Sequence, residues 1–99
     1  MKLVESRDGD IITIAIEGRV DTVTSPDLQN GILKAFQKSN KLILDFEKCD
    51  YISSAGLRAL LIGQKTATSK KGFMKLIKVS EIVLSVFEVT GFESILTIE

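Results

Sequence analysis

Two adjacent serines, Ser53 and Ser54, occupy the place in this 99-residue chain where a polar side chain could do chemistry. They follow an apolar run at residues 41–46 and precede a helical pattern that contains Leu57 and Leu60. A helix N-terminus offers free backbone N–H groups and about half a positive charge, so it can hold a phosphate, bound or attached to serine. The simpler interpretation is that Ser53 only caps the helix.

Other candidate groups give weaker signals. Asp45, Glu47 and Asp50 could be imagined as a metal or acid–base cluster, but solvated carboxylates at a strand end and loop are the preferred interpretation. Cys49 is expected to be a small, semi-buried apolar residue rather than a reactive thiol. The chain has no His, which removes the commonest general base and metal ligand. Phosphate-binding loop motifs are also absent, so we expect no enzyme, no metal site and no cofactor.

Composition excludes further classes of function. The 13 Lys and Arg balance the 13 Asp and Glu, and a neutral chain lacks the cationic field that nucleic-acid binding needs. No apolar run approaches the roughly 18 residues of a membrane span, and the N-terminus has no secretory pattern. One Cys allows no internal disulfide. These features predict one domain over residues 1–99 in the cytoplasm, binding neither nucleic acid nor membrane.

The first third of the chain predicts a hairpin and a helix. Residues 1–7 and 11–16 read as antiparallel strands joined by a tight turn at residues 8–10, with Gly18 ending the second strand. Ser25 is expected to cap a helix that has Pro26 at its first position. The residues that should form the buried stripe of this helix are Leu28, Ile32, Ala35 and Phe36.

Strands and helices then alternate. Residues 41–46 predict a strand buried on both faces, followed by the helix that opens at the two serines, with apolar Leu57, Leu60 and Leu61, and closes at residues 70–72. Residues 73–79 predict another strand, and residues 95–98 a short last one. Between these two strands a helix should start at Ser80 and end at Gly91, with a buried stripe of Ile82, Val83, Val86 and Phe87. This order predicts an α/β fold with a mixed, mostly parallel sheet of four to five strands and three to four helices.

Three segments together resemble the STAS domain, the family of bacterial anti-sigma factor antagonists. The central one is residues 44–61, LDFEKCDYISSAGLRALL, in which a strand ends in Asp and an aromatic–apolar–polar–Ser–small–Gly–Leu motif opens a helix. Residues 16–21, IEGRVD, and residues 87–92, FEVTGF, are similar to two further family segments. The resemblance covers nearly the whole chain and agrees with the predicted order of elements.

This resemblance implies a binding module that is switched by phosphorylation. Ser54 matches the family's phosphorylated serine, and Asp21 matches an acidic residue that lies beside it and helps to present it. The partner would be an anti-sigma factor that is also a serine kinase, bound by the unphosphorylated form, and a PPM-type serine phosphatase would restore that form. Ser53 stands where many members carry Asp, so it is an alternative phosphorylation site.

The resemblance also suggests which residues surround the phosphosite and contact the partner. We expect this set to comprise Val20, Asp21, Thr22, Asp50, Ile52, Ser53, Gly56, Leu57, Arg58 and Leu61. The alternative function is a STAS scaffold or accessory subunit that is never phosphorylated, for example in a lipid-transport complex. The sequence is compatible with a monomer or a weak dimer.

Overall fold

The N-terminal hairpin confirms the prediction from the Asp-Gly turn. In the computed structural model, which describes all residues 1–99, β1 (Lys2–Asp8) and β2 (Ile11–Val20) pair antiparallel with Asp8 opposite Ile11. Gly9 has a φ of +62°, a conformation that glycine adopts without the cost of a side chain. The prediction that the second strand ends at Gly18 is wrong. Gly18, with a φ of +100°, instead produces an irregularity within β2, and the strand continues to Val20.

Helix α1 (Ser25–Lys38) buries the four residues that the sequence predicts, Leu28, Ile32, Ala35 and Phe36. Its capping differs from the prediction, because Thr24 is the N-cap and Ser25 is the first helical residue, with its side chain buried. Pro26 lies in the first turn, where its missing N–H removes no helical hydrogen bond.

The segment before the second helix contains a strand that the sequence pattern did not predict. β3 (Lys41–Asp45) pairs parallel with the first half of β2, and β4 (Cys49–Ile52) pairs parallel with its second half. Helix α2 (Ser54–Ser69) follows directly after its N-cap, Ser53. The chain thus leaves β2 after Asp45 and returns to it at Cys49, which brings the start of α2 to the end of β2.

The C-terminal third holds β5 (Phe73–Ile77), α3 (Glu81–Thr90), a 3-10 turn at Phe92–Ser94 and β6 (Thr97–Ile98). The predicted start at Ser80 and end at Gly91 are confirmed; Ser80 is the N-cap of α3, and Gly91 has the left-handed conformation. The predicted buried stripe of α3 is only partly right. Val83 and Phe87 are buried, whereas Val86 is half-buried and Ile82 is 69% exposed.

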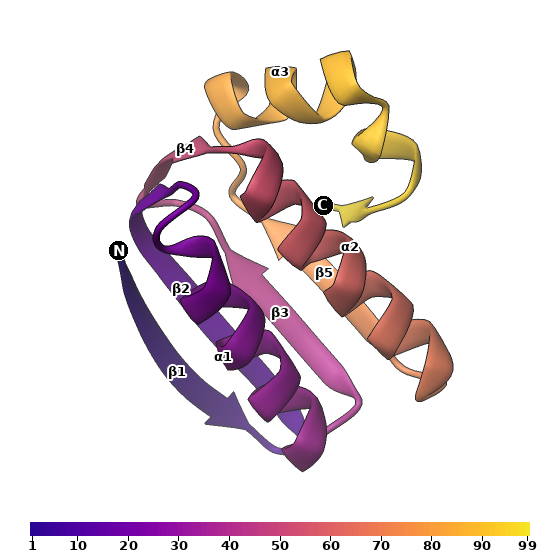
Figure 1. Cartoon of the computed structure of the whole chain (residues 1–99). Coiled ribbons are helices and arrows are strands. Elements are labelled where there is room, and N and C mark those ends of the chain that lie inside the picture. The colour runs from indigo at the N-terminus through magenta and orange to yellow at the C-terminus, as the bar shows by residue number, and fades with distance from the viewer.

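The sheet has the strand order β1-β2-β3-β5-β6, with β4 beside the second half of β2. All pairs except the N-terminal hairpin are parallel, which confirms the predicted mixed, mostly parallel α/β fold with three helices. The sheet has six strands rather than four to five, because β4 was not predicted. Helices α1 and α2 lie side by side over one face, and α3 lies across the end of the sheet at which α2 begins (Figure 1).

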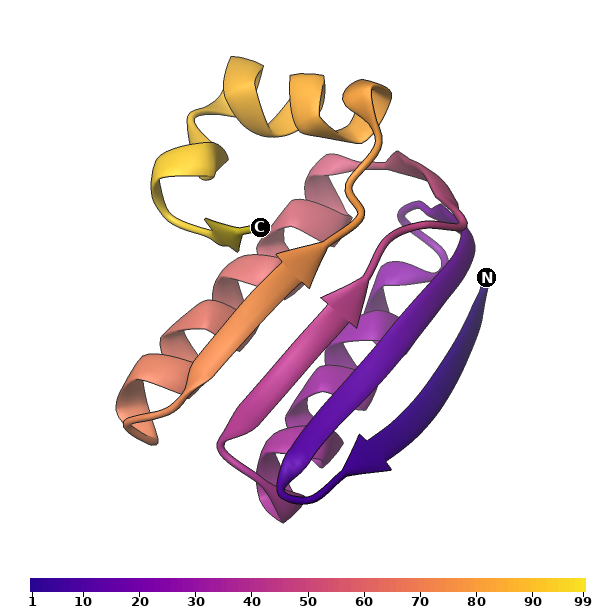
Figure 2. The same cartoon turned by 180° about the vertical axis from the view of Figure 1, so that it is seen from behind.

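The opposite face of the sheet carries no helix (Figure 2). The prediction that residues 41–46 are buried on both faces is therefore wrong: in β3, Leu42 and Leu44 are buried against the helices, while Lys41, Ile43 and Asp45 are half-buried on the open face. Lys75 covers part of this face, because its ammonium lies 4.7 Å from the ring centre of Phe73 and 3.3 Å from the Glu99 carboxylate.

Candidate functional site

Parallel pairing of β2 with β4 positions the start of α2. Val20 stands opposite Ile52, so the residues that follow them, Asp21 and Ser53, leave the sheet at the same edge. The Ser53 amide donates a hydrogen bond of 2.8 Å to the Val20 carbonyl, which fixes the N-cap to the end of β2. The β2–α1 loop and the first turn of α2 therefore form one surface at this end of the molecule.

The two serines have different environments. The Ser53 hydroxyl accepts a hydrogen bond of 3.3 Å from the Gly56 amide, and the side chain is half-buried. Ser54 is the first residue of α2, its side chain is exposed, and its hydroxyl makes no hydrogen bond to the rest of the chain. Ser53 is thus engaged as the helix cap, whereas the Ser54 hydroxyl is free and accessible.

Asp21 organises the loop beside these serines. One carboxylate oxygen accepts hydrogen bonds from the amides of Val23 and Thr24, at 3.0 and 2.9 Å, and from the Thr24 hydroxyl at 3.1 Å. These hydrogen bonds, those from Thr24 above all, hold the pKa of Asp21 below its ordinary value, and the nearby Arg19 charge acts in the same direction. Asp21 therefore remains a carboxylate well below neutral pH.

Four of the predicted contact residues form the floor of this surface. Val20, Ile52, Gly56 and Leu57 are buried, so the expectation that they contact a partner directly is corrected. A Cβ added to Gly56 would lie 2.7 Å from side-chain carbons of both Val20 and Ile52. The first turn of α2 consequently packs directly on β2 and β4, which fixes the position of Ser54 relative to these strands.

The remaining predicted residues lie at the surface. Thr22, Asp50, Ser54 and Arg58 are exposed, while Leu61 is half-buried on α2. Asp50 is the second residue of β4, three positions before Ser53, the cap of α2.

Three exposed side chains at this end were not predicted from the sequence. Val23 in the β2–α1 loop is 84% exposed and Ile82 in the first turn of α3 is 69% exposed. Tyr51 on β4 is 38% exposed, and the Arg19 guanidinium lies 4.2 Å from the centre of its ring. The isolated apolar Val23 among polar loop residues was the available signal for such a surface.

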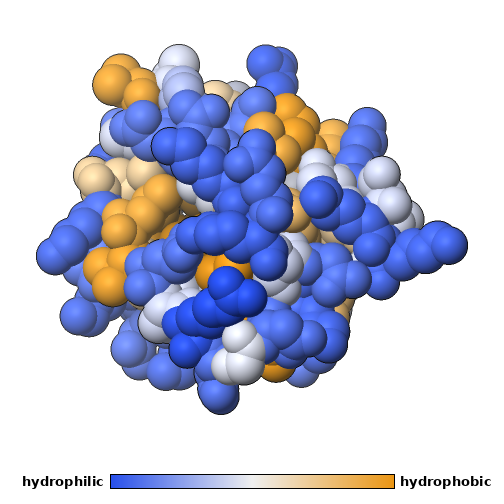
Figure 3. Space-filling model, turned by 90° about the horizontal axis from the view of Figure 1, so that it is seen from below, coloured by the Kyte–Doolittle hydropathy of each residue, from blue (hydrophilic) through white to orange (hydrophobic).

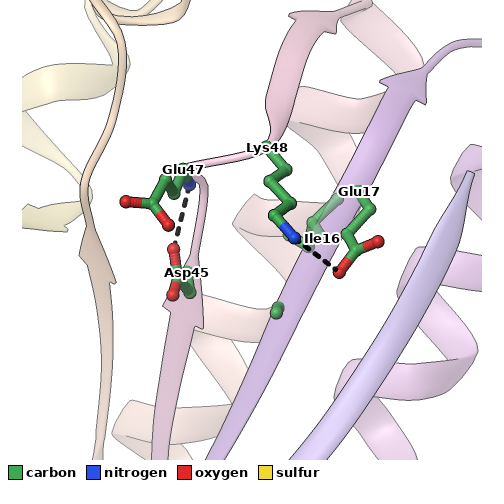
Figure 4. A pocket seen from close by; sticks show the side chains of 6 residues that line it. Ile16, Glu17, Asp45, Glu47 and Lys48 are labelled. Atoms are coloured by element: carbon green, nitrogen blue, oxygen red, sulfur yellow. Dashed lines mark hydrogen bonds and ion pairs between the residues drawn. The ribbon is translucent and has the colours of Figure 1, made fainter.

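The carboxylates near the end of β3 do not form one cluster. Asp45 accepts a hydrogen bond of 2.9 Å from the Glu47 amide, and both line a hollow of about 160 Å³ with Glu17 and Lys48 (Figure 4). Asp50 does not line this hollow. The Lys48 ammonium lies 3.9 Å from the Glu17 carboxylate, and the Lys78 ammonium lies 3.9 Å from the Glu47 carboxylate. No group of three side chains in the chain is arranged to hold a metal ion.

Cys49 lies in the core, with an exposed fraction of 2%. Burial raises the pKa of its thiol, because a thiolate loses solvation inside the protein, and the thiol is 3.5 Å from the Tyr51 carbonyl. Its surroundings agree with the prediction of a structural residue rather than a reactive one.

The end of the molecule opposite to Ser54 is mainly hydrophilic, with apolar side chains in separate patches (Figure 3). Charged residues gather there, and among them Lys41 pairs with Asp10 at 2.8 Å. No helix of the chain is long and apolar enough to cross a membrane.

A family model and two similar proteins indicate the same family for this chain. A family model described as the STAS domain matches residues 3–99. BtrV of Bordetella bronchiseptica, which is named as an anti-sigma factor antagonist, is 31% identical over 96 residues, covering 96% of this chain and 83% of that protein. An anti-sigma-B factor antagonist of Listeria monocytogenes is 26% identical over 98 residues, covering 97% of this chain and 85% of that protein.

Solved structures share the fold. A Thermotoga maritima protein described as an anti-sigma factor antagonist has a TM-score of 0.89 at 19% identity, covering 97% of this chain and 84% of that one. The antagonist SpoIIAA in its unphosphorylated form has a TM-score of 0.77 at 16% identity, covering 99% and 87%. Bacillus SpoIIAA in its phosphorylated form has a TM-score of 0.76 at 17% identity, covering 99% and 91%.

Proposed function

The chain belongs to the STAS domain family, and from this premise we propose that it is an anti-sigma factor antagonist switched by phosphorylation of Ser54. In the unphosphorylated state it binds an anti-sigma factor that is also a serine kinase, and this binding releases a sigma factor. A PPM-type serine phosphatase reverses the modification. Anti-sigma factor antagonists are regulatory binding proteins and not enzymes.

The observation that carries this proposal is the free, exposed Ser54 hydroxyl at the first position of α2. A kinase must reach the hydroxyl that it modifies, and Ser54 satisfies that requirement without any rearrangement. Ser53 would have to give up its hydrogen bond to the Gly56 amide before it could react. We therefore assign the modification to Ser54 rather than to Ser53.

The fold is well suited to tolerate a phosphate at this position. Phosphorylation adds about −1.5 to −2 charges and three acceptor oxygens at pH 7. The first-turn amides of α2 have no acceptors within the helix, and the positive end of the helix dipole favours an anion. SpoIIAA, which shares the fold, has been solved in both forms, and this chain matches both about equally well.

A docked partner would respond very differently to the same group. An interface that fits a serine hydroxyl cannot contain a phosphate without a steric clash, and the dianion would add to the negative charge that Asp21 and Asp50 already give this end of the molecule. A loss of about 3–4 kcal/mol in binding corresponds to two to three powers of ten in affinity, which is sufficient for a switch.

The surface around Ser54 supports a docking role. Val23 and Ile82 expose apolar side chains at this end of the molecule, and Thr22, Asp50 and Arg58 supply exposed polar and charged groups at the same end. Exposed apolar groups with polar surroundings are typical of protein-binding surfaces. We propose these five residues as contacts, with Asp21 and the buried residues beneath Ser54 positioning them.

The proposal is tested by intact-mass analysis after incubation with ATP and the anti-sigma factor kinase encoded in the same genome. We expect the wild type to gain one phosphate, Ser54→Ala to gain none, and Ser53→Ala to gain one. Undiminished labelling of Ser54→Ala would exclude Ser54 as the site.

A binding measurement separates the charge mechanism from the assignment of the site. Ser54→Asp should bind the unmodified protein's partner at least tenfold more weakly than the wild type, because it places a permanent anion in the interface. Ser54→Ala should bind about as well as the wild type, since it removes no charge and adds no bulk. Equal affinity of all three proteins would argue against the charge mechanism.

A further inference from the structure

A groove runs between α1 and α2 at the N-terminal part of α2, the helix that Ser54 begins. It encloses about 290 Å³ and is lined by α1 residues of the first two turns and by Ala55, Arg58 and Ile62 of α2. Ala55 follows Ser54 in the chain, so the groove opens next to the site of modification. Both helices lie on the same face of the sheet, as Figure 1 shows.

The groove contains hydrogen-bond donors and one positive charge, but no carboxylate. Gln29 and Asn30 line it from α1, and neither side chain makes a hydrogen bond to the rest of the chain. Arg58 lines it from α2, is exposed, and takes part in none of the five ion pairs of the protein. Two amides and an unpaired guanidinium around one hollow are complementary to a carboxylate, which accepts hydrogen bonds and balances the charge.

Arg58 is also placed to contact a phosphate on Ser54. Residues four apart on a helix are neighbours on its surface, with Cβ atoms about 5–6 Å apart. Ser54 and Arg58 have this spacing, both are exposed, and the guanidinium matches phosphate oxygens in two-point hydrogen bonding. The anionic residue precedes the cationic one along the helix, which is the more favourable order with respect to the helix dipole.

We propose that Arg58 is a docking residue with two alternative anionic partners. With Ser54 unmodified, it holds a carboxylate side chain of the anti-sigma factor in the groove between α1 and α2. With Ser54 phosphorylated, it pairs with the phosphate and is no longer available to that carboxylate. This inference rests on the proposed function, and it adds a second cause of release to the clash and repulsion at Ser54.

The phosphate contact can be tested without any kinase or partner. Phosphoserine is incorporated at position 54 during synthesis, in the otherwise wild-type protein and in Arg58→Gln, and the second pKa of the phosphate is measured by phosphorus NMR. We expect this pKa to be lower, by a few tenths, with arginine at position 58, because the cation favours the dianion. The matched control is Lys65→Gln, which removes an exposed cation of α2 outside the groove.

The proposed binding of a carboxylate in the groove is tested by measuring the affinity of the unmodified proteins for the anti-sigma factor. Arg58→Gln should bind about tenfold more weakly than the wild type and with a smaller dependence on salt, whereas Lys65→Gln should bind as the wild type does. Equal phosphate pKa values in the wild type and Arg58→Gln, or equal affinities, would overturn the inference. If phosphoserine shows the shift but Ser54 is never labelled by the kinase, the proposed function fails while the pairing of Arg58 with the phosphate stands.

Discussion

Ser53 and Ser54 differ by one position in the chain but have different surroundings. Ser53 accepts a hydrogen bond from the Gly56 amide and caps α2, so its loss should affect the stability of the fold. Ser54 makes no hydrogen bond through its side chain, so its loss should affect only what binds or modifies the surface. The types of the two residues are identical, and only their geometry separates them.

Replacement of the cap gives a stability prediction. Ser53→Ala should lower the free energy of unfolding by about 1 kcal/mol, because one first-turn amide of α2 loses its acceptor. Ser53→Asp should retain the wild-type stability to within about 0.5 kcal/mol, since Asp caps as well as Ser and its charge suits the helix N-terminus. Urea denaturation measures both values. An unchanged stability of Ser53→Ala would show that the hydrogen bond contributes nothing.

Asp21 predicts a dependence of stability on pH. Its pKa is lower in the folded protein than the ordinary value of 3.8, so the folded state favours the carboxylate and gains stability above that pH. This gain should disappear as the pH falls through the lowered folded pKa. Asp21→Asn has no such carboxylate, so the wild type should exceed it in unfolding free energy at pH 7.

The comparison is made by denaturation of both proteins between pH 7 and pH 2. We expect the two stability curves to converge below about pH 4, where the unfolded wild type becomes protonated. A constant difference across this range would mean that the hydrogen bonds from Val23 and Thr24 do not depend on the charge of Asp21.

At the scale of helices and strands, apolar residues that repeat at regular spacing predicted the structure well. Short segments, and segments with only one buried face, were not predicted as well. The buried stripe of α1 repeats at helical spacing, and all four of its residues are buried as expected. β4 has only four residues, two of them exposed, so no periodicity marks it. It forms because the second half of β2 needs a hydrogen-bonding partner once β3 has ended, and that requirement is tertiary.

β3 and α3 each have one exposed face, and this explains two further differences between the prediction and the structure. Residues 41–46 read as a strand buried on both faces, because an apolar run looks the same whether one face or two are covered. Likewise six of the ten residues of α3 are apolar, and the pattern alone does not tell which of them face the core. Val83 and Phe87 are the buried ones, and the Phe87 ring meets that of Phe46 edge-on, with ring centres 6.3 Å apart.

The contact of α2 with the strands beneath it predicts an effect of Gly56→Ala. Alanine favours a helix over glycine by about 1 kcal/mol, but its Cβ would press on Val20 and Ile52 at 2.7 Å, and overpacking of a core costs about 1–3 kcal/mol. We expect a net loss of about 1 kcal/mol in the free energy of unfolding. Slower phosphorylation of Ser54 should accompany it, since the first turn must move.

Gly31→Ala is the matched control, because Gly31 also lies within a helix. The nearest atom to its added Cβ is the end of the Leu3 side chain on the edge strand β1, at 2.8 Å, and this end can turn away. We expect Gly31→Ala to be neutral or to stabilise by up to about 1 kcal/mol. Thermal unfolding of the two variants measures both changes in stability. Equal losses of stability in Gly56→Ala and Gly31→Ala would contradict the expectation.

At the scale of the whole molecule, the surface that we propose for recognition lies at one end. The β2–α1 loop, the start of α2 and the first turn of α3 all follow the carboxyl ends of parallel strands, so the topology gathers them at one edge. The sequence motif identified the two serines and Asp21 within this end. It did not identify Val23, Tyr51 or Ile82. Only the apolar type of Val23 within a polar loop gave a local signal, and the exposure of Tyr51 and Ile82 depends on packing that the local sequence does not encode.

The neutral charge of the chain predicts that phosphorylation leaves the fold intact. A phosphate changes the formal net charge from 0 to about −2, a small change for a molecule with 13 cations and 13 anions. Amide NMR spectra of the two forms should differ only in the β2–α1 loop, the first two turns of α2 and the adjoining part of α3. Shifts throughout the β1–β2 hairpin would indicate a global rearrangement instead.

The most direct test compares the affinities of the unmodified and the Ser54-phosphorylated protein for the anti-sigma factor, by titration calorimetry in one buffer. The account predicts tight binding of the unmodified form and an affinity at least 100-fold lower for the phosphorylated one, with Ser54→Ala indistinguishable from the unmodified form. Affinities of the two forms that agree within threefold would contradict a phosphorylation switch at Ser54.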